Sequence, residues 1–152
     1  MKKKSVIVFS IALVGAFIIG AIVWMSMTGY SRVLKTNWEL EIPFSARCSE
    51  VYEKDTGASF NGDGIRFHVF SCKNEDRIDD MLVWTDDDHS TIYYGSLSEA
   101  AEQWLDVLDV PEEWRPEYDD SRYYYCSQED NSELIIFWSK EAKMLYIVEN
   151  FV

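Results

Sequence analysis

The sequence predicts an α+β fold, with a mainly antiparallel sheet of about five or six strands covered by one long amphipathic helix and preceded by a single transmembrane helix. Three observations support this prediction: an uncharged N-terminal run, short segments rich in β-branched and aromatic residues, and one stretch with helical periodicity. The expected domains are a signal anchor over residues 1–30, a tether over 31–37 and an extracytoplasmic α+β domain over 38–152. The last segment is long enough to bury one hydrophobic core.

The uncharged run indicates a membrane anchor. Residues 6–27 contain no ionisable side chain, and a helix needs about 20 such residues to cross the hydrocarbon core of a bilayer. Lys2–Lys4 precede the run, which favours a cytoplasmic amino terminus. The alternative is a cleaved secretory signal, but its apolar region spans about 7–15 residues. We therefore expect a single-pass cell-membrane protein whose C-terminal domain is extracytoplasmic.

Small residues recur within the anchor at helical spacing. Ala12, Ala16 and Gly20 would line one face of the helix, and such small-xxx-small faces allow two helices to approach closely. This pattern predicts a homodimer through the anchor. The alternative is that small residues are simply common in membrane spans.

The part of the chain beyond the anchor is strongly acidic. All 27 Asp and Glu follow residue 30, together with 11 of the 14 Lys and Arg, which gives this part a net charge of −16. Nucleic acids and anionic lipid surfaces require basic patches, so neither is an expected partner. A basic protein partner or a divalent cation is compatible with this charge. The aromatic content of 15% indicates a folded domain rather than a disordered acidic tail.

Periodicity places the individual elements of the domain. Ser96 and Glu99 form a capping box ahead of apolar residues at helical spacing, and Pro111 ends this helix. The last two strands are apolar on both faces, which is typical of strands inside a sheet or of strands that face a partner. The expected strands are 38–42, 47–54, 64–72, 122–127, 134–138 and 144–149.

Three cysteines follow the anchor. A hairpin of the second and third strands, centred near Phe60, places Cys48 opposite Cys72, and an extracytoplasmic location permits a disulfide between them. Cys126 then has no partner in the chain. No C-x-x-C spacing is present, so the cysteines do not indicate a zinc or thioredoxin-like site.

The same hairpin predicts which other side chains meet. Tyr52 falls opposite His68, because both are four residues from the paired cysteines. Val51 is expected on the apolar face that carries Ile65, Phe67 and Val69.

The connection between these strands carries the most distinctive motif. Asp55-Thr56-Gly57-Ala58-Ser59 matches the D-T-G-[AS]-[ST] signature of aspartic proteases, in which two carboxylates share a proton. However, Glu53-Lys54 precede the motif where apolar residues are expected, and a second copy would have to come from a dimer. Turn chemistry explains the motif equally well. The candidate loop residues are Asp55, Thr56, Gly57, Phe60, Gly62, Asp63 and Gly64.

Two further groups of residues are candidates for binding. Carboxylates at Asp55, Asp63, Asp86 and Asp88 are weak candidates for calcium ligands, because their spacing does not match an EF-hand loop. We assign no metal and no cofactor. Exposed aromatic side chains anchor many interfaces, although core packing is the alternative for these. The aromatic candidates are Trp114, Tyr118, Tyr123 and Tyr125.

Two motifs carry a resemblance. One is D-T-x-x-x-F-x-G-D-G over residues 55–64, and the other is L-Y-x-x-E over residues 145–149. Together they resemble a group of small uncharacterised membrane-anchored bacterial proteins. Residues 57–59 are Gly-Ala-Ser here, where that group has His-Gly-Gly. The resemblance implies an anchored protein in which residues 55–57 belong to a longer structural loop.

These observations predict a membrane-anchored, non-catalytic domain that binds a protein or peptide partner at the cell envelope. The first alternative is a divalent-cation module of the calcium-binding type. The second is an aspartic-protease-like enzyme acting through Asp55-Thr56-Gly57.

Overall fold

The computed structural model describes residues 15, 29–57, 63–89 and 95–152. The chain folds as two compact units, Met1–Phe44 and Ser45–Val152. The predicted span over 6–27, with its small-residue face, lies outside the described residues except for Gly15. Within the described part of the chain, no helix is both long and apolar enough to cross a membrane. The transmembrane helix therefore stays a prediction.

The first unit contains helix α2, Gly29–Trp38. The segment 31–37, expected as a tether, is thus helical, and the strand expected over 38–42 is wrong because residues 39–42 form neither helix nor strand. Buried Tyr30 and Leu34 lie four residues apart, which is the spacing of one helix face. The chain follows this helical spacing up to Trp38 and does not form the strand that the apolar–acidic alternation predicted.

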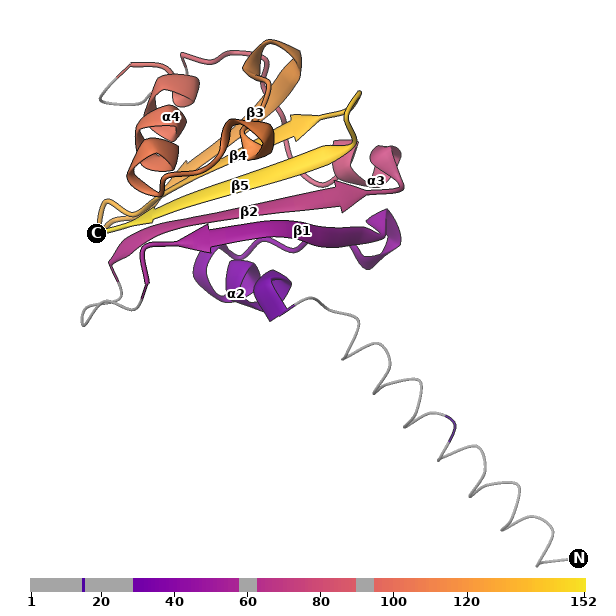
Figure 1. Cartoon of the computed structure of the whole chain (residues 1–152). Coiled ribbons are helices and arrows are strands. Elements are labelled where there is room, and N and C mark those ends of the chain that lie inside the picture. Colours follow the sequence, from indigo (N-terminus) through magenta and orange to yellow (C-terminus); the bar gives the residue numbers. More distant parts are fainter. Residues whose placement is uncertain (1–14, 16–28, 58–62, 90–94) are drawn as a thin grey trace, which may run out of the picture. The chain divides into compact units, whose positions relative to one another are not determined.

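The second unit, Ser45–Val152, is called the sheet domain below. It confirms the α+β class, and its described residues form five antiparallel strands in the order β1-β2-β5-β4-β3 (Figure 1). The two strands expected to be interior, β4 and β5, are indeed flanked on both sides. The strands are β1 Cys48–Asp55, β2 Gly64–Cys72, β3 Ser121–Ser127, β4 Glu133–Ser139 and β5 Met144–Phe151. The short helix η1, Phe44–Ala46, begins one residue before the sheet domain. The other helices are α3 Glu75–Asp79, α4 Leu97–Val107, η2 Glu112–Trp114 and η3 Tyr118–Asp120.

Helix α4 covers one face of the sheet (Figure 1). The predicted capping box is confirmed: Glu99 N–H donates to Ser96 Oγ at 3.2 Å, and Ser96 N–H donates to Glu99 Oε2 at 3.0 Å. These bonds satisfy amides at the helix start that have no partner within the helix. The core beneath the helix is formed by Ile65, Phe67, Val69, Leu97, Ala100, Ala101, Leu105, Leu108, Val110, Tyr123, Ile135, Phe137, Tyr146 and Val148.

The β1–β2 hairpin contains a bulge that the sequence pattern did not predict. Cys48 pairs with Cys72, as expected, but the register shifts between Glu50 and Tyr52. Val51 is the extra residue of the bulge, and its 41% exposed surface contradicts the prediction that it lies on the apolar face. Tyr52 consequently pairs with Val69 rather than with His68.

Candidate functional site

The candidate site lies on β1, the outermost strand on one side of the sheet (Figure 1). Within the described residues, the backbone of β1 pairs with β2 alone. The opposite edge differs, because Thr85, which belongs to no strand, forms an isolated antiparallel bridge with Tyr123 of β3. The β1 edge therefore presents backbone donors and acceptors that no described segment uses.

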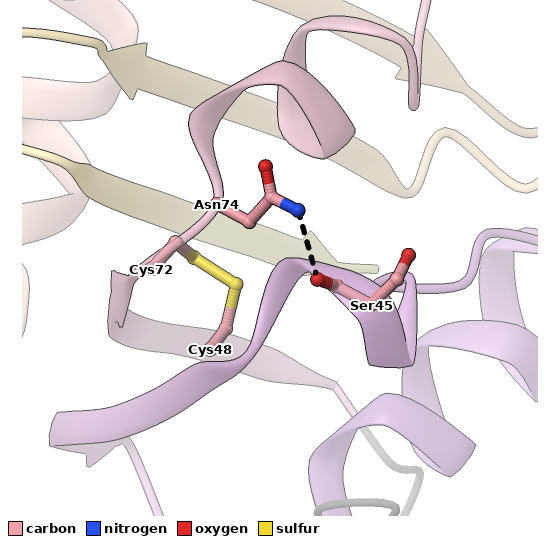
Figure 2. Close-up of a disulfide and its surroundings, with 4 residues drawn as sticks. All are labelled: Ser45, Cys48, Cys72 and Asn74. Carbon is pink, nitrogen blue, oxygen red and sulfur yellow. Dashed lines mark hydrogen bonds between the residues drawn. A yellow bond between two sulfur atoms is a disulfide. The ribbon is translucent and has the colours of Figure 1, made fainter.

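A disulfide fixes the first residue of β1. The predicted bridge between Cys48 and Cys72 is present and joins β1 to the end of β2 (Figure 2). Beside it, Asn74 Nδ2 donates to the carbonyl oxygen of Ser45 at 3.3 Å, and Asn74 N–H donates to Ala46 at 3.0 Å. The strand therefore starts from an anchored segment.

The far end of β1 is closed by the Asp55-Thr56-Gly57 turn. Thr56 N–H donates to Ile65 O at 3.0 Å, and Ile65 N–H donates to Thr56 Oγ1 at 3.2 Å. Gly57 N–H donates to Asp55 Oδ1 at 2.8 Å, which is an Asx turn. These bonds support a structural loop, because the Asp55 carboxylate and the Thr56 hydroxyl each bind the turn's own backbone.

Gly64 shows why glycine is needed where the loop returns to the sheet. Its φ is +141°, and a Cβ atom there would lie 2.2 Å from Thr56 Oγ1. Asp63 is exposed, while Phe60 and Gly62 lie outside the described residues.

Aromatic stacking holds the middle of β1 on the core side. Tyr52 stacks on Trp114 with ring centroids 4.9 Å apart, and it meets Phe67 edge-on at 6.0 Å. Lys54 Nζ donates to the carbonyl oxygen of Asp109, in the turn after α4. This half of β1 is thus attached to the same layer as α4.

The opposite face of β1 carries a cluster of three side chains: Glu50, Glu53 and His68. One possible ligand atom from each lies within 4.8 Å of the others. His68 Nδ1 lies 2.6 Å from Glu50 Oε1, and the side chain of Glu50 is 26% exposed. His68 is 9% exposed, whereas Glu53 is on the surface. The cluster therefore runs from the interior to solvent.

The bulge explains how the cluster forms. Side chains three residues apart on a regular strand point to opposite faces. Because Val51 is inserted, Glu50 pairs with Phe70 while Glu53 pairs with His68, and residues 68 and 70 share a face of β2. Both carboxylates consequently flank the imidazole. Sequence reasoning missed this set because the spacing of the two Glu residues argues against a common face.

Burial determines the charge states in the cluster. It lowers the pKa of His68 to about 4, against the opposing effect of the Glu53 carboxylate. The imidazole is therefore neutral at pH 7, and its Nδ1 and Glu50 Oε1 share a hydrogen bond of 2.6 Å. Burial also raises the pKa of the Glu50 carboxyl, because a charged group is less well solvated there.

A shallow groove of about 410 Å³ follows the outside of β1 and is lined by Glu50, Val51, Tyr52 and Glu53. Its lining places two neighbouring side chains, Val51 and Tyr52, between two acidic ones, Glu50 and Glu53. A groove along an edge strand is the kind of surface on which an extended segment of another chain can add as a further strand.

The four aromatic candidates are partly or fully buried. Trp114, Tyr118 and Tyr125 pack against the core, and Tyr123 belongs to it. Tyr118 Oη donates to Glu102 Oε1 at 2.5 Å, and Tyr123 Oη donates to the carbonyl oxygen of Tyr118 at 2.9 Å. Burial raises the pKa of Tyr123 to about 12. The structure thus assigns these side chains definite packing roles.

The weak acidic candidates are dispersed, and those near α4 and β3 have protein partners. Asp88 Oδ2 accepts from Ser98 Oγ at 2.6 Å and Asp88 Oδ1 accepts from Ser98 N–H at 2.9 Å, which supports the start of α4. Asp86 lies 3.5 Å from the Arg122 guanidinium. In the ranges that the structure describes, the group suited to a metal ion is Glu50, Glu53 and His68, which contains none of these residues.

Comparisons with protein-family models, with curated proteins and with solved structures give no match to this chain.

Proposed function

We propose that the protein is a membrane-anchored, non-catalytic binding module whose extracytoplasmic sheet domain docks an extended, basic segment of a protein partner along β1. The observation that carries this proposal is the edge position of β1, whose backbone pairs with β2 alone among the described segments. An added strand would use the remaining backbone groups for affinity and the groove beside β1 for side-chain selection.

The negative charge of the sheet domain indicates which kind of segment would dock on β1. The sheet domain holds 25 of the 27 acidic residues and nine basic ones, so its net charge is −16. Glu53 and Asp55 are exposed on β1 itself. A second copy of the sheet domain would bring the same charges into contact, and this like-charge repulsion disfavours pairing of two copies through β1. Lys or Arg side chains on a partner strand would instead be attracted.

The proposed anchor over residues 6–27 would hold the sheet domain at the outer surface of the membrane. Anchoring restricts the domain to partners near that surface and raises its effective concentration there. The small-residue face of Ala12, Ala16 and Gly20 would add avidity by pairing two anchors.

The test measures binding of a fluorescent ten-residue peptide of alternating Val and Lys to the full-length chain in detergent with EDTA. We expect binding that is lost when alternate peptide amides are N-methylated, because strand addition needs those donors. Glu53→Lys should weaken binding about fivefold by reversing one exposed charge, whereas Glu141→Lys, in the β4–β5 turn, should not. Equal binding of the methylated peptide, or equal losses in both variants, would contradict the proposal.

A further inference from the structure

We propose that Glu50, Glu53 and His68 bind one divalent first-row transition metal ion, with Zn²⁺ as the reference ion. Two carboxylate oxygens and one imidazole nitrogen lie within 4.8 Å of one another, so small side-chain rotations bring all three to bonding distance around one ion. The set is not a patch of surface acids, because its nitrogen donor is 9% exposed and contacts Glu50.

The backbone organises these ligands in advance. The disulfide fixes the β1–β2 pairing at Cys48, which places Glu50 on the face that carries His68, and the bulge at Val51 then brings Glu53 to the same face. Tyr52, between them, is held on the opposite face by its stack on Trp114. Rigid strands with locked neighbours are the kind of scaffold that positions metal ligands precisely.

The donor set favours a transition metal over calcium. Calcium takes six to eight oxygen ligands, whereas imidazole nitrogen with carboxylate oxygen suits zinc and its neighbours. The neutral imidazole is the form that coordinates a metal. Binding through Nδ1 would replace the present 2.6 Å contact between Nδ1 and Glu50 Oε1, with the proton of the neutral imidazole on Nε2.

The exposed end of the cluster leaves room for further ligands. Glu53 lies at the surface and lines the groove with Glu50, so water or a donor from another molecule can complete the coordination shell. The site would cross-link β1 to β2 a few residues from the disulfide. This inference is independent of peptide docking, which is tested in EDTA.

The experiment titrates the full-length chain in detergent with Zn²⁺ alone, with binding followed by calorimetry. We expect one ion per chain, and affinity reduced more than about tenfold in Glu53→Gln and in His68→Gln. Because Glu53 is exposed, its variant should keep the fold even if the His68 variant does not. Co²⁺ should give visible absorption bands that Glu53→Gln changes.

Two matched variants separate this site from general attraction to an acidic protein. Glu141→Gln removes the same charge from an exposed turn, and Cys126→Ser removes the unbridged thiol; both should bind Zn²⁺ like the parent chain. Ca²⁺ at the same concentration should produce no comparable binding. Equal Zn²⁺ affinity in parent and Glu53→Gln chains, or loss only in Cys126→Ser, would overturn the proposal.

Discussion

At the β3 edge of the sheet, Thr85 N–H donates to Tyr123 O at 2.9 Å and Tyr123 N–H donates to Thr85 O at 2.7 Å. At the β1 edge, no described segment makes a corresponding pair. The β3 edge is also crossed by ion pairs, since Arg122 lies 3.5 Å from Asp86 and 3.9 Å from Asp79. The β1 edge instead carries a disulfide, a bulge and two carboxylates around a buried imidazole.

The comparison shows that an edge strand can be held firmly in place and still be accessible to a partner. At the β3 edge, Thr85 uses both backbone groups of Tyr123, so a partner strand could not pair there without displacing this bridge. The β1 edge is fixed through its ends and its inner side, by Cys48, the Thr56 turn and Tyr52, while its outer side stays accessible. A strand that is rigid but accessible meets the requirements of a docking site, because little conformational entropy is lost on binding.

Removing the disulfide should produce the largest effect. The Cys48→Ser/Cys72→Ser double variant opens a loop closed over a sequence separation of 24 residues, which lowers the free energy of unfolding by about 3 kcal/mol in the chain-entropy model. Urea unfolding measures this change. Cys126→Ser, on β3, is the control and should change stability by less than about 0.5 kcal/mol. Similar losses in both variants would mean that the β1 edge does not depend on its bridge.

A smaller loss of stability is expected from a substitution near the β3 edge, at Asp79 of α3. Its carboxylate accepts from Trp138 Nε1 at 2.9 Å and from Lys140 Nζ at 2.6 Å. Burial raises the pKa of Asp79, but these two hydrogen bonds and the positive charges of Lys140 and Arg122 together leave the pKa below its ordinary value. We expect Asp79→Asn to lower the free energy of unfolding by about 1–2 kcal/mol at pH 7.

The pH dependence identifies the source of that loss. A carboxyl with a lowered folded-state pKa binds fewer protons when folded, so its stabilisation is present above the unfolded-state pKa and is lost as the pH falls through the folded-state pKa. The difference between parent and Asp79→Asn should therefore shrink as the pH falls below about 4. Denaturant melts across this range measure it, and a difference that stays constant would exclude the ionised carboxylate as the cause.

Local signals in the sequence were sufficient for several elements. The capping box at Ser96 and Glu99 and the pairing of Cys48 with Cys72 depend on short-range chemistry or on a hairpin's symmetry, and both are confirmed. The strand expected at 38–42 failed because an alternating pattern of five residues does not exclude other conformations.

The candidate site depends on a feature with no local signal. A bulge is set by how two strands pack over the core, and nothing in the residues around Val51 marks the extra position. Counting residues from Cys48 therefore gave the right partner for the first three residues of β1 and the wrong partner from Tyr52 onward. Glu53 lies beyond that shift, so its approach to Glu50 and His68 could be found only in the structure.

The smallest expected effect tests the bulge directly. Val51 is 41% exposed and Val69 is 0% exposed, although an unshifted hairpin would place both on the apolar face. Val51→Ala should change the free energy of unfolding by less than about 0.5 kcal/mol, because it removes methyl groups from solvent-exposed surface. Val69→Ala should lower it by about 2 kcal/mol, since it leaves a cavity under α4. Equal losses would mean that the strand pairs without a bulge, and Glu50 and Glu53 would then lie on opposite faces and share no metal ion.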